Sequence, residues 1–585
     1  MAATSAACTR SVVSSPPQSD SDMSASSRRR QRGHAHLRAL ACCLVALMCP
    51  ASAFHPRPSL ASRARRGQGG RSVSSGGEEL SINILRRQPP TYVEGGWTTL
   101  DLSIFGGAKE DTDTVTPERP LRVIVAGGGI GGLTLANALK KHGINYEVFE
   151  KTPEYREFGG PIQLQSNALA ALEAINYVMA EEIMAAGTKT GNRINGLKHP
   201  FTNKWIAKFD TGSPAIRSGL PLTRVVDRPA LQATLKHHLG PDHLHFGRSV
   251  IGYEILKNGT VAIDVSDGTR TYGDVLVGAD GIWSVVRAKM MGEKWSDATK
   301  PGYETSTYSG FTVFTGVCKH RPRDVNEVAY KVYLSVDQYF VCSDVGRGRI
   351  QWYAFINQPP DTVEHMLGQA VPYLLERFTG WSLEVTDILE ATLEENIQQR
   401  DLYDRPPAMQ GWNKGPITIL GDAAHPMMPN LGQGGCQAIE DSYQLANVLK
   451  NVKKRSRLPF ALGVYGTPRL WRSAVVQGVS RLASDALSAS APLFKFPPVT
   501  IGVGAFMSFV YLPLLFTFLY MNPLSEEDRK TTMQRMSNLA EYEKGKSQHE
   551  YKTVKDAEKE LDRKDAVWSR LDKEKGRFEE KPCPF

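Results

Sequence analysis

Short apolar runs separated by helix-length stretches dominate the middle of the chain. The run VIVA at 123–126 is continuous and apolar, so it predicts a buried strand, and residues 133–141 then show helical spacing. YEVFE at 146–150 predicts a second strand, and VLV at 275–277 and ITIL at 417–420 predict two more. Because strands that alternate with helices indicate a parallel sheet, we expect an α/β fold with a Rossmann-like domain.

Residues 190–225 and 300–360 have a different pattern, in which β-branched and aromatic residues alternate or cluster. STYSGFTVFTGVC at 306–318 and VAYKVYLSVDQYFVCSD at 328–344 are the clearest examples. We expect a mainly β substrate domain inserted in the α/β domain, with its sheet covering the binding site. Aromatic residues on such strands are more often core than ligand contacts, so none of them is assigned to the pocket.

No charged residue lies between Lys495 and Glu526, and this apolar stretch is longer than the ~20 residues that a membrane span needs. Pro513 lies in its middle. We expect residues 496–524 to attach to a membrane as a monotopic or hairpin segment, and a full span and a buried core helix are the alternatives. Residues 525–585 carry mixed charges at i,i+4 spacing, which predicts a solvated helix or a disordered tail.

The net charge of +9 lies entirely in the N-terminal region. Residues 1–89 contain 13 Arg, no Lys and 4 acidic residues, so the rest of the chain is neutral. A nucleic-acid-binding function, which needs a basic surface, is therefore not indicated. Four of the eight cysteines also lie in that region and the other four are scattered, so neither a disulfide framework nor a metal site is predicted.

The N-terminal region has the three parts of a secretory signal peptide. Residues 28–38 are positively charged, residues 37–48 are apolar, and ASA at 51–53 is a cleavage pattern. Residues 54–75 are then rich in Arg and Ser without an acidic residue, as in transit peptides. The combination resembles the bipartite presequence of algae with secondarily acquired plastids, which implies a plastid location. A signal anchor is the alternative.

The first predicted strand leads directly into Gly127, Gly129 and Gly132, which form a G-x-G-x-x-G motif before the helix. In this motif the first glycine allows a tight turn, the second lets a pyrophosphate approach, and the third lets helix and strand pack closely. The helix N-terminus adds unpaired N–H groups and partial positive charge. Glu150 ends the second strand, where a carboxylate can hydrogen-bond a ribose. The motif predicts dinucleotide binding but does not separate NAD from FAD.

Two further motifs follow predicted strands. Asp280-Gly281 follows the strand at 275–277, where its carboxylate can orient toward a diphosphate, and Gly421-Asp422 follows the strand at 417–420, where Asp422 can accept a hydrogen bond from a sugar-alcohol hydroxyl. The next helix begins near Gly434, and its N-terminus would stabilise negative charge on a flavin near N1 and O2. The residues expected to line the flavin are Pro429, Gly432 and Gly434. We interpret His425 as a loop or capping histidine rather than a catalytic base.

Together the three motifs resemble the single-component, FAD-dependent aromatic-hydroxylase class of monooxygenases. Arg228 begins RPALQATL, which matches the R-x-x-L-x-x-x-L helix of that class, whose arginine lies near the FAD. Residues 158–175, 400–407 and 420–441 resemble the zeaxanthin epoxidases within it. The resemblance covers residues 119–490, but the forkhead-associated domain of the plant members has no counterpart that we detect in this sequence.

The resemblance implies FAD as the cofactor, NADPH as a transient reductant and O2 as a co-substrate. Oxygen would add at flavin C4a, and the hydroperoxide would attack a carbon–carbon double bond in a β-ring of a lipid-soluble, hydroxylated carotenoid at the thylakoid membrane. No residue is assigned as a base, because epoxidation of an alkene requires no deprotonation of the substrate but needs a dry pocket. A phenol-type hydroxylase and a non-catalytic flavin- or carotenoid-binding protein are the alternatives, because fold alone does not fix function.

The cofactor-binding residues expected from the motifs and the resemblance are Gly127, Gly129, Gly132, Glu150, Arg228, Asp280, Gly281, Gly421, Asp422, Pro429, Gly432, Gly434 and Gly435. The expected segments are a signal peptide at 1–53, a transit peptide and linker at 54–90, three parts of the FAD-binding domain at 119–190, 226–298 and 396–490, two parts of the substrate domain at 191–225 and 299–395, the apolar segment at 496–524 and the tail at 525–585.

Overall fold

The computed structural model describes residues 112–155, 160–294, 305–335, 337–362, 368–490, 502, 505–521, 524–544 and 563–564. The predicted signal and transit peptides lie outside these residues. Of the charged tail, the described part begins with helix α14 (Glu526–Lys544), and most of the rest of the tail lies outside them as well.

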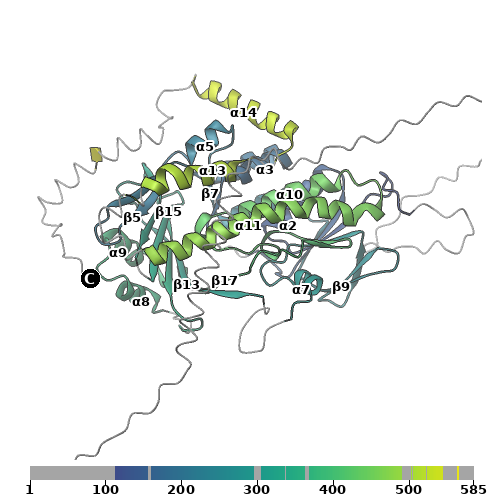
Figure 1. Cartoon of the computed structure of the whole chain (residues 1–585), viewed down its shortest axis with the longest axis horizontal. Coiled ribbons are helices and arrows are strands. Elements are labelled where there is room, and N and C mark those ends of the chain that lie inside the picture. The colour runs from purple at the N-terminus through teal and green to yellow at the C-terminus, as the bar shows by residue number, and fades with distance from the viewer. Residues whose placement is uncertain are drawn as a thin grey trace, which may run out of the picture. The chain divides into compact units, whose positions relative to one another are not determined.

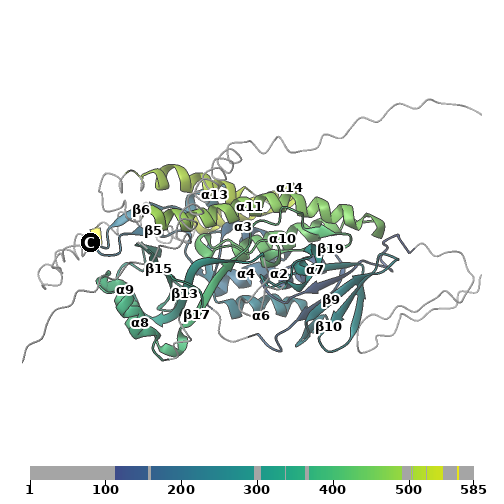
Figure 2. The same ribbon diagram turned by 60° about the horizontal axis from the view of Figure 1, so that its bottom comes forward.

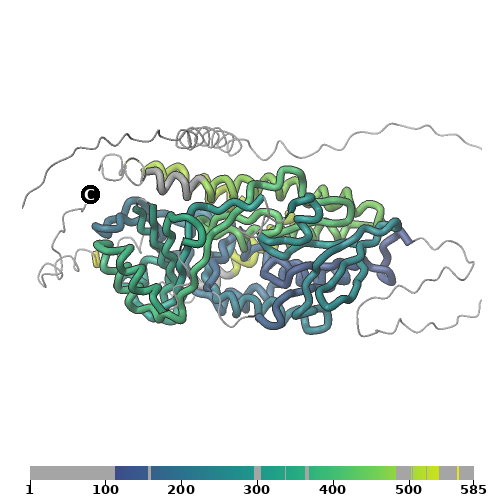
Figure 3. Tube along the Cα trace, turned by 90° about the horizontal axis from the view of Figure 1, so that it is seen from below, coloured from purple at the N-terminus to yellow at the C-terminus, as the bar shows by residue number. Residues whose placement is uncertain are grey.

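A six-stranded sheet brings together segments that are far apart in the sequence. Its order is β18-β19-β12-β1-β2-β8, and each neighbouring pair is parallel except β18 and β19. The strands are β18 (Asn413–Lys414), β19 (Ile417–Ile419), β12 (Val275–Gly278), β1 (Arg122–Ala126), β2 (Asn145–Glu150) and β8 (Leu244–Phe246). The Cα trace in Figure 3 shows the early purple-blue segments beside green segments from the last third of the fold. The prediction of an α/β fold is confirmed.

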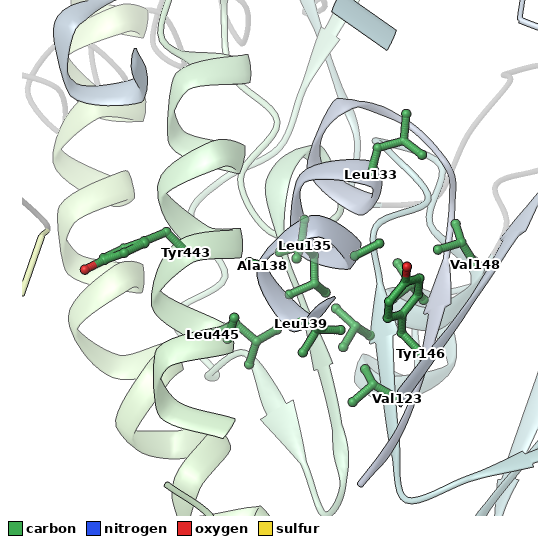
Figure 4. Close-up of a cluster of buried hydrophobic side chains, with 14 of the residues drawn as sticks. Val123, Leu133, Leu135, Ala138, Leu139, Tyr146, Val148, Tyr443 and Leu445 are labelled. Carbon is green, nitrogen blue, oxygen red and sulfur yellow. The ribbon is translucent and has the colours of Figure 1, made fainter. Parts of the chain in front are cut away.

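Helix α2 (Ile130–Lys141) packs between this sheet and α10 (Gly434–Leu449), as the close-up in Figure 4 shows. Leu135 and Leu139 of α2 are fully buried there, because the apolar residues of α2 recur at helical spacing. The two helices approach closely at Gly131, where a Cβ would lie 2.8 Å from Leu420 Cδ1 and where Ser442 donates a hydrogen bond to the glycine carbonyl at 2.9 Å. This packing fixes the N-termini of α2 and α10 relative to the sheet.

Smaller elements surround this core (Figure 1). The helices are α3 (Ser166–Ile175), α4 (Tyr177–Ala186), α5 (Gly212–Arg217), α6 (Arg228–Leu239) and α7 (Val285–Met291). One antiparallel three-stranded sheet consists of β11 (Arg270–Gly273), β10 (Val261–Val265) and β9 (Val250–Ile255), and the other consists of β3 (Ile162–Leu164), β7 (Arg224–Val226) and β4 (Thr188–Lys189).

A seven-stranded sheet forms from the two stretches rich in β-branched and aromatic residues and from the segment before residue 405. Its order is β17-β13-β16-β15-β14-β5-β6, and only β14 and β5 pair in parallel. The strands are β17 (Gln398–Asp404), β13 (Thr307–Lys319), β16 (Arg349–Asn357), β15 (Gln338–Asp344), β14 (Val328–Leu334), β5 (Ile194–Lys198) and β6 (Trp205–Phe209). Helices α8 (Ala370–Arg377) and α9 (Leu383–Glu390) cover one face, as Figure 2 shows.

The long helix α11 (Leu458–Ser490) packs against α10 and against the short helix α13 (Leu512–Tyr520). A π-helical turn at Met507–Tyr511 precedes α13. Pro513 explains this turn, because proline cannot donate a backbone hydrogen bond and its ring displaces the carbonyl four residues earlier.

The described residues of the predicted membrane segment are largely apolar on both their buried side and their exposed side. Leu512, Leu515, Phe516, Leu519 and Tyr520 are buried against α3, α5 and α11. On the outward side, Phe509 is 81% exposed and Val510 and Leu514 are 44% and 49% exposed. Among the residues that the structure describes, there is no helix with the length and apolar character required to cross a membrane. The inward face of α13 is that of a core helix.

Candidate functional site

The three sequence motifs and Glu150 come together because each follows the carboxyl end of a parallel strand. Gly127 follows β1, Glu150 ends β2, Asp280 follows β12, and Gly421 follows β19 by one residue. The carboxyl ends of these four strands lie at the same height in the sheet, since Ala126 pairs with Phe149 and with Gly278, and Gly278 pairs with Ile419. Ligands of open α/β sheets bind at this edge, so the fold places all of these residues around one site.

The glycines of the first motif differ in what surrounds them. Gly127 has a φ of +106°, and a Cβ there would lie 2.3 Å from the carbonyl oxygen of Ala279. A Cβ at Gly132 would lie 1.9 Å from the carbonyl oxygen of Gly127. At Gly129, by contrast, φ is −70° and no described atom lies within 4 Å of the Cβ position. The protein itself therefore requires glycine at 127 and 132, whereas glycine at 129 leaves open space beside the helix N-terminus.

Glu150 braces the glycine loop. Its Oε2 accepts a hydrogen bond from the Gly128 N–H at 2.7 Å, and its Oε1 accepts bonds from the Thr152 N–H and hydroxyl at 3.0 and 2.9 Å. The hydroxyl of Tyr155 also donates to the Gly128 carbonyl. The carboxylate thus has a structural role in this loop, in addition to any ribose contact.

Asp280 caps helix α7 with one oxygen only. Its Oδ2 accepts hydrogen bonds from the N–H groups of Val285 and Val286 at 2.9 and 3.3 Å. Its Oδ1 is buried without a hydrogen-bond partner among the described residues. Burial raises the pKa of Asp280, although hydrogen bonds from Ser284 and from backbone N–H groups oppose this effect. Gly281 next to it has a φ of +80°. A hydrogen-bond donor from outside the protein, such as a cofactor hydroxyl, could pair with this buried carboxylate oxygen.

Asp422 lies at the centre of the edge and keeps an accessible carboxylate. Protein atoms crowd it on most sides, and this desolvation raises its pKa, while the charges of His425 and Arg228 lower it. The start of α10 lies close to Asp422, because a Cβ at Gly434 would lie 3.8 Å from its Oδ1. Arg228 is exposed at the start of α6. The structure therefore brings Asp422, Gly434 and the Arg228 charge to one place.

The glycine-rich loop runs as a 3-10 turn at Pro429–Leu431 and then enters α10 at Gly434. Gly432 has a φ of +61°, and a Cβ at Gly435 would lie 2.8 Å from Ile162 Cδ1. The first turns of α2 and α10 contain no acidic residue, and neither helix has a side-chain cap. Their partial positive charges are therefore not neutralised by acidic residues in their own first turns.

Buried side chains hold this loop from behind. Arg287 donates to the carbonyls of Ala423 and Ala424 at 3.2 and 3.1 Å, and Gln477 donates to the carbonyl of Pro426 at 3.0 Å. His425, which is fully buried, hydrogen-bonds Asp441 through Nε2 at 2.6 Å. These contacts hold the backbone of residues 423–426, which lead into the loop, in one position.

The sequence analysis missed the charged cluster beneath the loop. Glu440 and Asp441 are fully buried on α10, where Arg469 pairs with both and Arg472 pairs with Glu440 at 2.7 Å. Burial alone would raise the pKa of each acid, but the arginine charges outweigh it and lower both values to about 2. A signal was present in the sequence: two adjacent acids in a helix without any other charged residue, and two arginines three residues apart on the next helix.

The face of the seven-stranded sheet that α8 and α9 do not cover meets the loop through buried aromatic residues. Tyr339 stacks on Phe355 with ring centroids 4.2 Å apart, and its hydroxyl donates to Asn430 in the loop at 2.9 Å. The apolar cluster on this face also contains Phe311 and Met428. The loop and the sheet therefore enclose a largely apolar environment.

This edge, with two bare helix N-termini and the three motifs, defines a dinucleotide-binding protein of the FAD type. A family profile described as "FAD binding domain" matches residues 120–479, and the chain belongs to this family.

Its relatives narrow the comparison. The chain is 44% identical over 432 residues to "Zeaxanthin epoxidase, chloroplastic" of an Oncidium hybrid cultivar, an alignment that covers 71% of this chain and 63% of the relative. It is 46% identical over 379 residues to the protein of the same name from Nicotiana plumbaginifolia. That alignment covers 63% of this chain and 55% of the relative. The chain thus spans less than two thirds of the length of these relatives.

Solved structures show the same fold at low identity. HpxO of Klebsiella pneumoniae, in complex with FAD and uric acid, matches with a TM-score of 0.60 and 22% identity, over 68% of this chain and 97% of that one. A salicylate hydroxylase in complex with its substrate matches with a TM-score of 0.55 and 22% identity, over 69% and 99%. These similarities concern the fold alone.

Proposed function

We propose that this protein is an FAD-dependent monooxygenase that uses NADPH and O2 to epoxidise the β-rings of xanthophylls, converting zeaxanthin to antheraxanthin and then violaxanthin. The observation that carries the proposal is the identity of 44–46% to the zeaxanthin epoxidases, over alignments of 379 and 432 residues. The family match over residues 120–479 supports the same cofactor.

The residues at the strand edge fit FAD. The open space beside Gly129 suits a pyrophosphate at the N-terminus of α2, and the accessible carboxylate of Asp422 suits a ribityl hydroxyl. The unpaired Oδ1 of Asp280 offers a further acceptor. Glu150 would hold the ribose, and the loop from Pro429 to Gly435 would lie along the flavin ring.

Bound FAD supplies the redox chemistry, which is reduction by NADPH and transfer of one atom of O2 to the substrate double bond. The protein's part is to orient the ring and to exclude water. The apolar sheet face with Tyr339 and Phe355 would enclose the β-ring, and the hydrogen bond between Tyr339 and Asn430 holds that face to the loop. Because an alkene needs no deprotonation, this environment requires no base.

A product assay tests the proposal. The purified chain, with FAD, NADPH and O2, is given zeaxanthin in lipid vesicles, and mass spectrometry follows the addition of one and then two oxygen atoms that derive from O2. Stepwise addition would support the proposal. Reducible flavin without any oxygenated xanthophyll would contradict it, and salicylate or another phenol is then the substrate class to examine. Bound flavin that NADPH does not reduce would indicate a non-catalytic protein.

Asp422→Ala is expected to weaken FAD binding about tenfold to a hundredfold, because a charge-assisted hydrogen bond contributes about 1.5–3 kcal/mol. Fluorescence titration of the apoprotein with FAD measures the effect. Asp264→Ala is the matched control, since Asp264 is a half-exposed carboxylate on β10. Equal affinity in the two variants would remove Asp422 from the cofactor site.

The plastid location and membrane contact belong to the same proposal. The curated relatives are named as chloroplastic, and a carotenoid substrate resides in lipid. The outward side of the π-helical turn and α13, formed by Phe509, Val510 and Leu514, is the described surface that suits peripheral contact with a bilayer, because it is apolar, aromatic and free of charge.

Replacing Phe509, Val510 and Leu514 together by Ser is expected to reduce binding to lipid vesicles by about tenfold or more, because each apolar side chain inserted in lipid contributes on the order of 1 kcal/mol. Co-sedimentation with vesicles measures this. The double variant Ile251→Ser and Ile255→Ser on β9 is the control, since both residues are exposed and apolar but lie elsewhere. Point substitutions are preferable to deleting residues 496–524, because the inward face of α13 belongs to the core. Unchanged sedimentation of the triple variant would rule out this surface.

A further inference from the structure

Arg472 lies where helix α13 meets the helices behind the flavin loop. Its Nη1 and Nη2 donate to the carbonyls of Phe518 and Leu519 at 3.0 and 2.7 Å. These carbonyls are in the last turn of α13, where the Phe518 carbonyl accepts only a long bond from the Met521 N–H at 3.3 Å, and a positive charge there also interacts favourably with the helix dipole. The guanidinium therefore caps α13.

The same guanidinium holds Glu440 on α10. Its Nε and Nη2 donate to the two carboxylate oxygens at 2.7 and 2.9 Å. Asn167 on α3 donates to Glu440 Oε1 at 2.6 Å and to the side-chain oxygen of Gln433 at 3.1 Å. Gln433 is the residue directly before α10, so the contacts of Arg472 continue to the N-terminus that faces the flavin.

The last hydrogen bonds of this series reach the loop at 429–431. Gln433 donates to the side-chain oxygen of Gln165 at 2.6 Å, and Gln165 donates to the carbonyl of Leu431 at 2.6 Å. Leu431 and Met427 also pack against the apolar cluster that buries α13. An unbroken series of hydrogen bonds thus joins the C-terminus of α13 to the loop proposed to hold the flavin ring.

This series is stiff because its members are buried. Glu440 and Gln433 are fully inaccessible, and Asn167 is 1% exposed. Buried polar groups are costly to leave without partners, so a change at one end must be accommodated along the whole network. If α13 moved away, Arg472 would lose two acceptors and open to water, and its hold on Glu440 would weaken.

We propose that Arg472 is a positioning residue that links the docking of α13 to the binding of FAD. It does not touch the cofactor. FAD stabilises the docked position of α13, and, because linkage is reciprocal, docked α13 stabilises bound FAD. The inference rests on FAD binding and on no particular substrate, so it can fail or succeed independently of the epoxidation assay.

Hydrogen exchange of the full chain, followed by mass spectrometry with and without FAD, tests the link. In the wild-type protein FAD is expected to slow exchange of residues 505–521. In Arg472→Gln, FAD should bind about fivefold to tenfold more weakly, and at saturating FAD this segment should no longer gain protection. The visible circular dichroism of the bound flavin should also change, which a purely structural cap would not cause.

Two further variants make the outcome decisive. Asn167→Leu interrupts the series without touching α13, so it should remove the FAD-dependent protection while leaving exchange of 505–521 without FAD as in the wild type. Arg481→Gln, on the same helix and paired with the buried Asp404 rather than with Glu440, should show the same FAD-dependent protection of residues 505–521 as the wild type. The inference is overturned if FAD does not protect residues 505–521 in the wild type, or if it protects them equally in Arg472→Gln and Asn167→Leu.

Discussion

Gly129→Val is expected to weaken FAD binding by about tenfold to more than a hundredfold while leaving the apoprotein folded. The reason is the open space at this position, where φ is −70° and no described atom lies within 4 Å of a Cβ. A valine is therefore compatible with the protein but would occupy the space where the pyrophosphate approaches the N-terminus of α2. Overpacking of this kind typically costs about 1–3 kcal/mol, which corresponds to about tenfold to more than a hundredfold in affinity.

Gly132→Val provides the comparison. A Cβ at Gly132 would lie 1.9 Å from a backbone oxygen, so this variant is expected to destabilise the fold itself. Thermal unfolding of the two apoproteins and titration with FAD separate the effects. Gly129→Val should unfold near the wild-type temperature, within about 1 kcal/mol for the altered helix cap. FAD binding of Gly129→Val within twofold of wild type would mean that the pyrophosphate lies elsewhere.

Arg469→Met is expected to cause the largest loss of stability, about 3–5 kcal/mol near neutral pH, because it leaves buried carboxylates without a compensating charge. Arg469 is 3% exposed and bonds both Glu440 and Asp441, and Asp441 in turn holds the Gly421 N–H and His425. The loop that ends β19 should therefore loosen together with the fold. Urea unfolding monitored by far-UV circular dichroism measures the difference.

The loss of stability in Arg469→Met is expected to become smaller at low pH. The pKa values of Glu440 and Asp441 are lowered to about 2 in the fold, so their contribution to stability is present above their ordinary values of 4.5 and 3.8 and is lost as pH falls toward about 2. The difference in unfolding free energy between the wild type and Arg469→Met should therefore become smaller as pH falls from about 4.5 toward about 2. Arg270→Met, whose side chain is 43% exposed and pairs with Glu254 at 60% exposure, should cost far less stability and show no such narrowing. Equal losses in both variants would refute a special role for the buried cluster.

The strand and helix around the first motif were predictable because their signals are local. A continuous apolar run gave β1, helical spacing gave α2, and the positions of Gly127 and Gly132 are required by contacts within a few residues or with the adjacent strand. The meeting of the motifs was also predictable, since parallel strands present their carboxyl ends at one edge. The fold class followed from these elements.

The parts that escaped prediction depend on contacts between distant segments. Glu440 and Arg472 carry charges that a sequence pattern assigns to a surface, and only the packing of α10 against α11 and α13 shows that they are paired inside. The apolar length of residues 496–524 predicted a monotopic or hairpin attachment to a membrane, with a full span and a buried core helix as alternatives. Among the described residues of this segment, one face of α13 packs in the core, which composition does not reveal. Composition alone could not distinguish these environments.

The sheet order β19-β12-β1-β2 also determines when the binding site can exist during synthesis. A nascent chain that ends before residue 417 already contains Gly127, Glu150 and Asp280, but it lacks β19, Asp422 and the N-terminus of α10. Contacts of such long sequence separation form late, because the intervening chain must first be ordered. FAD therefore has no complete site on a partly emerged chain. The cofactor can be acquired only after nearly the whole α/β domain has been released from the ribosome or has passed through any membrane on its route.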